Sequence, residues 1–111
     1  MVRRWLQALR NRTLLRRSLA QAVTIAEASQ PVVWDRVRDS IFQMDIPQAR
    51  GYVRARAAAI IRQQAELVLG TRHKFSDRAV ARIHRLATER VIHLLFVDLL
   101  SSGKEGRRLA A

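Results

Sequence analysis

The spacing of apolar residues constrains the fold of this chain more than any other feature of the sequence. Apolar side chains recur every three or four residues along nearly the whole length, and no useful stretch alternates as a β-strand would. Glycine and proline, with four and two copies, fall mainly at the ends of these periodic stretches. The pattern predicts an all-α fold, a bundle of four or five helices.

Short breaks in the pattern divide the chain into four predicted helical segments. They cover about residues 2–28, 31–45, 47–70 and 77–102. A bend or break near Asn11 would explain a change of phase in the first segment, and Ser29 to Pro31 separates it from the second. Gly70 is suited to a helix C-cap and Ser76 to an N-cap, so both ends of the loop between the last two segments are well defined.

The second half of the fourth segment is apolar on nearly all sides. Such a helix must be covered on all sides, which in a small chain indicates either a subunit interface or the central helix of the bundle. We favour a homodimer. The residues predicted to form its interface are Val91, Leu94, Leu95, Phe96 and Leu99. The length of 111 residues fits one helical domain over residues 1–102, with a frayed tail over 103–111.

The chain is strongly basic, with 21 lysine and arginine residues against nine acidic ones and a formal net charge of +12. Lys74 and Lys104 are the two lysines, and every other basic residue is arginine. The arginine guanidinium binds phosphate and carboxylate well. Coding bias is the alternative explanation. Cysteine is absent, which excludes disulfides and thiolate chemistry, and no apolar run approaches the length of a membrane span. We expect a cytoplasmic protein.

Six arginines precede the first acidic residue, Glu27, on an amphipathic stretch that includes Trp5. They are Arg3, Arg4, Arg10, Arg12, Arg16 and Arg17. Such a stretch can bind a phosphate backbone, because each neutralised phosphate releases counter-ions. It can also lie on an anionic membrane surface or act as an organellar transit peptide. A solvated helix face with biased coding is the remaining interpretation.

Arg50, Arg54 and Arg56 form a second basic group. On a helical wheel Arg50 and Arg54 fall on the apolar side of the third segment, where surface arginines are unexpected. Either the start of this helix projects beyond the bundle, or these arginines pair with buried acids. Asp98, on the apolar side of the fourth segment, is the predicted partner.

The same stretch carries a short resemblance to a known family. Ile46-Pro47-Gln48 followed by Arg54-Ala55-Arg56-Ala57 resembles the start of the recognition helix in region 4 of bacterial sigma factors, over about fifteen residues. The alanine and glycine of the family's tight turn are missing from the preceding helix. The resemblance implies that a set of side chains would face the DNA major groove, namely Gln48, Arg50, Tyr52 and Arg54.

The sequence predicts neither catalysis nor a metal or cofactor site. His73, His84 and His93 lie nine or more residues apart, which does not match metal-ligand spacing on one helix face. Asp35 and Asp39 are the only close acidic pair, and the flanking arginines fit an exposed face. We therefore expect a non-enzymatic protein that binds DNA or RNA non-specifically. The alternatives are a helical module that binds an acidic protein or self-assembles, and a protein of the membrane surface.

Overall fold

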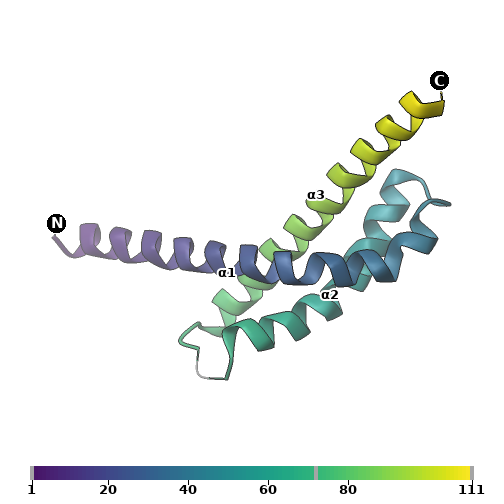
Figure 1. Ribbon diagram of the computed structural model, residues 1–111. Coiled ribbons are helices and arrows are strands. Elements are labelled where there is room, and N and C mark those ends of the chain that lie inside the picture. The colour runs from purple at the N-terminus through teal and green to yellow at the C-terminus, as the bar shows by residue number, and fades with distance from the viewer. Residues whose placement is uncertain (1, 72, 111) are drawn as a thin grey trace.

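The computed structural model describes residues 2–71 and 73–110, and the side chains of all of these except residues 11, 14 and 101–110. Within this part the chain forms three helices and no strand (Figure 1). The helices are α1 (Val2–Ile41), α2 (Ile46–Leu69) and α3 (Asp77–Ala110). The predicted all-α class is confirmed. The predicted count of four or five helices is too high, because the first two predicted segments form one helix.

α1 continues through both places where the sequence predicted a break, Asn11 and Pro31. A proline inside a helix costs about 3 kcal/mol relative to alanine. Pro31, however, lies on the exposed side of α1. Because proline has no N–H, the carbonyl of Glu27, four residues earlier, loses its helical hydrogen bond. Glu27 is also exposed, so this carbonyl can bond to water. On the opposite side a buried stripe passes the proline without a change of phase, with Ala22, Ile25, Ser29, Val33 and Val37. Burial of this stripe offsets the local cost.

α2 begins and ends where the sequence predicted. The Asp45 carboxylate caps its start by accepting the backbone N–H of Gln48 at 2.8 Å, and Pro47 occupies the first turn. At the other end the N–H of Gly70 donates to the carbonyl of Glu66 at 3.0 Å. Gly70 has a φ of 70°, in the left-handed region that favours glycine.

α3 starts at the predicted cap, since the Ser76 hydroxyl accepts the backbone N–H of Ala79 at 3.2 Å. The helix extends past Ser102, where the sequence predicted its end, to Ala110. The side chains of residues 101–110 and the whole of residue 111 lie outside the described part of the chain. The frayed tail expected over residues 103–111 therefore stays a prediction.

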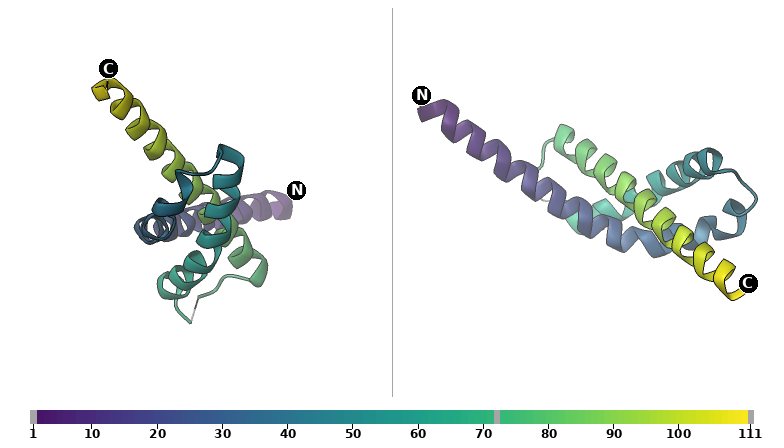
Figure 2. Two further views of the ribbon diagram at one scale, coloured as in Figure 1. Left: turned by 90° about the vertical axis from the view of Figure 1, so that its right-hand side faces the viewer. Right: turned by 90° about the horizontal axis from the view of Figure 1, so that it is seen from above.

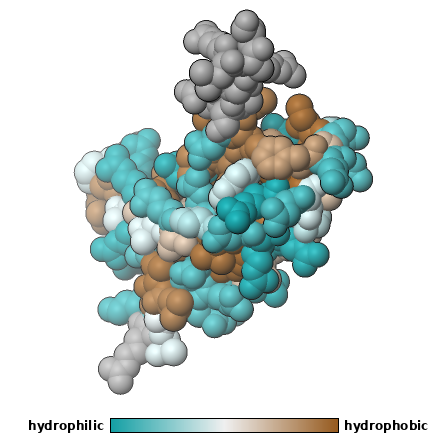
Figure 3. All heavy atoms as spheres, turned by 45° about the vertical axis from the view of Figure 1, so that its right-hand side comes forward, coloured by the Kyte–Doolittle hydropathy of each residue, from teal (hydrophilic) through white to brown (hydrophobic). Residues whose placement is uncertain are grey.

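All three helices contact one another and enclose a single core. Each helix contributes a fully buried isoleucine, namely Ile25, Ile61 and Ile83. Figure 3 shows that apolar residues also reach the surface between hydrophilic ones. Phe42, Leu67 and Leu100 are the most exposed of those on the bundle, at 71%, 77% and 59%.

The N-terminal part of α1 extends beyond the other two helices, as Figures 1 and 2 show from three directions. Every described side chain of residues 2–17 is exposed, and Ser18 is the first buried residue. The radius of gyration is 17.5 Å, against about 13 Å for a compact domain of this length. We call residues 2–17 the arm and residues 18–100 the bundle.

Candidate functional site

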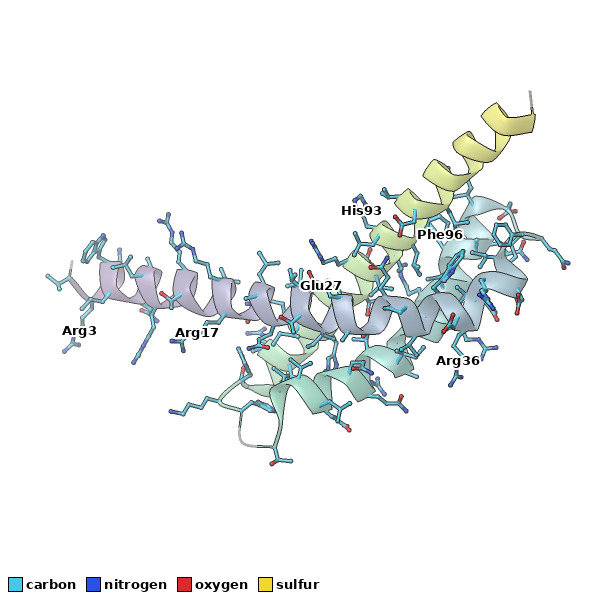
Figure 4. The ribbon with its side chains drawn as sticks, viewed as in Figure 1. Arg3, Arg17, Glu27, Arg36, His93 and Phe96 are labelled. Carbon is cyan, nitrogen blue, oxygen red and sulfur yellow. The ribbon has the colours of Figure 1, made fainter. Side chains whose placement is uncertain are left out.

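The arm carries all six arginines of the predicted N-terminal group. Each of them is exposed: Arg3, Arg4, Arg10, Arg12, Arg16 and Arg17. Figure 4 shows Arg3 and Arg17 extending from the same side of the arm, as expected for residues two heptads apart. Arg12 and Arg16, one turn apart, lie on another side of the helix. The arm therefore presents guanidinium groups in several directions.

No carboxylate among the described residues forms an ion pair with an arginine of the arm. Within the described residues, one ion pair is formed, between Arg54 and Glu89 of the bundle. The charges of residues 3–17 fall within about 21 Å, because an α-helix rises about 1.5 Å per residue. Mutual repulsion of these charges is relieved when anions gather around them. The arm is thus electrostatically suited to a polyanion.

One side of the arm is apolar and exposed. Val2, Trp5, Leu6 and Leu9 recur at three- and four-residue spacing, with exposed fractions of 71%, 66%, 55% and 41%. We call these four residues the apolar stripe. It ends at Leu9, whereas the arginines continue to Arg17. None of the helices, as far as the chain is described, has a stretch long and apolar enough to cross a bilayer.

The second predicted basic group does not join the arm. Arg54 donates to the carboxylate of Glu89 on α3 at 2.9 Å, and the Arg50 guanidinium lies over the ring of Phe96, also on α3, at 5.6 Å. Arg56 lies over the ring of Tyr52 at 5.3 Å. Arg50 and Arg54 therefore face α3, which explains why both fall on the apolar side of the helical wheel.

The predicted pairing of these arginines with Asp98 is wrong. The Asp98 carboxylate accepts a hydrogen bond from the side-chain amide of Gln30 on α1 at 3.2 Å. Arg54 pairs instead with Glu89, which lies two and a half turns before Asp98 on α3. Both side chains of this pair are more than half exposed. Tyr52, which the sigma-factor resemblance placed in a DNA groove, is half-buried. The Ser40 hydroxyl, and after it the Arg56 guanidinium, lower the pKa of Tyr52.

The residues predicted to form a dimer interface divide into two groups. Val91 and Leu95 are buried in the core of the single chain, at 0% and 3% exposed. The remaining three, Leu94, Phe96 and Leu99, are half-buried, and Phe96 and Leu99 pack against the core. The outer side of α3 leaves other apolar residues exposed, namely Val97 and Leu100. A dimer through α3 stays a prediction, and its contacts would include these outer residues.

A basic cleft at the base of the arm was missed by sequence reasoning. It has a volume of about 260 Å³ and lies between Ser18 of α1 and the segment that leads into α3, where Lys74, Arg78 and Arg82 line it. The four-residue spacing of these three basic residues around the start of a helix is a signal of such a group that the sequence does contain. Their proximity to Ser18 depends on how α3 packs on α1, which the sequence alone does not show.

Two of the three histidines lie beside a second cavity, of about 300 Å³, between α2 and the start of α3. His73 and His84 line it together with Arg62 and Glu66. Burial lowers the pKa of His84, and Arg62 lowers it further, whereas Glu66 acts in the opposite direction. No group of three metal-ligating side chains is found in the described part of the chain. That the protein is not an enzyme stays a prediction.

Comparison with known proteins gives no match to a family model, to a curated protein or to a solved structure. Function is therefore inferred from the residues of this chain.

Proposed function

We propose that this protein binds nucleic acid by contacts between the arm arginines and the phosphate backbone. The observation that carries the proposal is the placement of six exposed arginines, without a carboxylate partner in the described residues, on a helix that extends beyond the bundle. Each guanidinium that neutralises a phosphate releases condensed counter-ions, and this release drives binding. Arginine also matches the geometry of phosphate oxygens better than lysine does.

Binding of this kind is independent of base sequence. Phosphate contacts fix position and supply affinity, whereas sequence is read by side chains that reach base edges in a groove. Arg50 and Arg54, the residues that the sigma-factor resemblance would place at base edges, contact Phe96 and Glu89 of the same chain. The proposed interface therefore consists of the arm, and the protein would bind unrelated duplexes equally well.

The test is a fluorescence-anisotropy titration of two unrelated labelled duplexes of about 20 base pairs. With about six phosphate contacts, the association constant is expected to fall about a thousandfold between about 50 and 200 mM salt. The two duplexes are expected to give the same affinity within about threefold, because mainly phosphates are contacted. Absence of binding at the lower salt concentration would exclude this function.

The apolar stripe favours a second candidate function, binding to an anionic membrane surface. A helix with an apolar side flanked by arginines can bury that side at the lipid headgroup boundary. Replacing Trp5, Leu6 and Leu9 with serine would abolish co-sedimentation with phosphatidylserine vesicles if this function is correct. The same variant keeps all arm arginines, so its affinity for duplex DNA would stay close to that of the parent chain if nucleic acid is the ligand.

A further inference from the structure

The basic cleft at the base of the arm brings together two parts of the chain that are distant in sequence. Ser18 of α1 forms one wall, and the segment from Lys74 to Arg82 forms the other. Ser18 directly follows Arg16 and Arg17, so the cleft begins where the exposed arginines of the arm end. At about 260 Å³ the cleft is smaller than ordinary pockets for whole cofactors, which have about 300–1,000 Å³. It has room for a phosphate group.

Three cationic side chains line this cleft: Lys74, Arg78 and Arg82. Arg78 and Arg82 are one turn apart and therefore neighbours on one side of α3. None of the three forms an ion pair with a carboxylate of the described residues. Asp77, the acidic residue of the first turn of α3, is not among the residues that line the cleft. The cleft therefore holds positive charge that no ion pair of the described residues neutralises.

Hydroxyl groups and the helix start add hydrogen-bond donors to this charge. The Ser76 oxygen accepts the N–H of Ala79 at 3.2 Å, which leaves the hydroxyl hydrogen of Ser76 able to donate. Ser18, only 2% exposed, supplies a second hydroxyl from the opposite wall. The start of α3 carries the positive end of the helix dipole, which favours an anion at this point.

We infer that this cleft binds one phosphate group, held by Lys74, Arg78 and Arg82. The inference deepens the proposed function, since a backbone phosphate seated here would anchor the nucleic acid at the base of the arm. The same chemistry would bind a free phosphate or a phosphate monoester. Arginine forks and a lysine ammonium are suited to phosphate oxygens, and the three that line this cleft come from one short stretch of chain.

Titration of the full chain with inorganic phosphate, followed by amide NMR at constant ionic strength, tests the cleft directly. The largest shifts are expected at the amides of Ser18, Ser76 and Ala79. Replacing Arg78 and Arg82 with glutamine should weaken phosphate binding at these amides at least about tenfold, because two charge-assisted contacts are lost. The matched control replaces Arg85 and Arg90, which are exposed on α3 outside the cleft and carry the same charge.

Three results would overturn the inference: no shift at the cleft amides, equal shifts along the arm, or equal weakening by the control pair. Lys74→Gln, in the loop before α3, is a second variant that leaves the helix intact, and it should also weaken phosphate binding. The duplex titration separates the two proposals. If phosphate binds in the cleft but the protein does not bind a duplex, the cleft is a site for free phosphate or a phosphate monoester. If the protein binds a duplex but phosphate does not bind in the cleft, the arm alone forms the nucleic-acid interface.

Discussion

Arg54 of α2 and Glu89 of α3 form an ion pair in which guanidinium Nη2 lies 2.9 Å from carboxylate Oε1. The two side chains are 58% and 56% exposed, so water and salt screen their attraction. Across the described residues this is the single arginine charge that a carboxylate neutralises. The six arginines of the arm therefore stay available to anions outside the chain.

The Arg54–Glu89 pair is expected to contribute little to stability. In a double-mutant cycle with Arg54→Ala and Glu89→Ala, the coupling free energy should be about 0.2–1 kcal/mol, the range for exposed pairs. Urea unfolding followed by circular dichroism measures it. A coupling energy above about 3 kcal/mol would show that the pair is desolvated, as buried pairs are.

Replacing Ser29 with alanine is expected to stabilise the protein. Ser29 is fully buried in the stripe of α1 that faces the core, and its hydroxyl has no hydrogen-bond partner in the described part of the chain. Removing a buried hydroxyl without a partner should raise the free energy of unfolding by about 1 kcal/mol. Ala28→Ser, at the neighbouring exposed position, is the control and should change it by about 0.5 kcal/mol or less. Loss of stability in Ser29→Ala would show that the hydroxyl is bonded.

Leu95→Ala distinguishes a core residue from an interface residue. Because Leu95 is 3% exposed within one chain, its truncation should lower the free energy of unfolding by about 2–5 kcal/mol. The loss should be the same at low and high protein concentration, which urea unfolding at two concentrations tests. Leu100→Ala, at a position 59% exposed, should change stability by less than about 0.5 kcal/mol unless a second copy covers it. A concentration-dependent loss for Leu95→Ala would place this residue in a dimer contact.

The lowered pKa of His84 makes stability depend on pH. As the pH falls below 6.5, the ordinary pKa of histidine, the unfolded chain binds a proton at His84 before the folded chain does. The contribution of neutral His84 to the free energy of unfolding is therefore fully present above pH 6.5. It is lost as the pH falls through the lower pKa that His84 has in the folded state. Unfolding free energies measured from about pH 8 to 5 should decrease less steeply in His84→Gln than in the parent chain. An equally steep decrease in His84→Gln would contradict a role of this residue in the pH dependence.

Local chemistry could be predicted from the sequence, and long-range packing could not. Asp45, Gly70 and Ser76 act within one turn of the chain, so the ends of α2 and the start of α3 followed from residue type alone. Pro31 was misleading because its cost is local, whereas the buried stripe that offsets it belongs to the packed bundle.

The candidate site shows the same division. The arm arginines are a run in sequence on one helix, so their grouping was predictable. The helical wheel singled out Arg50 and Arg54 as well, with partners within the chain as one of two explanations. Which acidic residue faces them depends on how α2 is aligned along α3, so the sequence alone does not distinguish Asp98 from Glu89. The cleft beside Ser18 needed the packing of α3 on α1 as well.

The salt dependence of duplex binding in two charge-matched variants tests the role of the arm most directly. One variant replaces Arg3, Arg10 and Arg17 of the arm with glutamine, and the other replaces Arg36, Arg85 and Arg90, which are exposed on the bundle. Both remove three positive charges. For the arm variant, the slope of log association constant against log salt should become shallower by about 2.7, or about 0.9 for each lost phosphate contact. The bundle variant should keep the parent slope. Equal changes in the two variants would contradict an interface on the arm and leave net charge as the explanation.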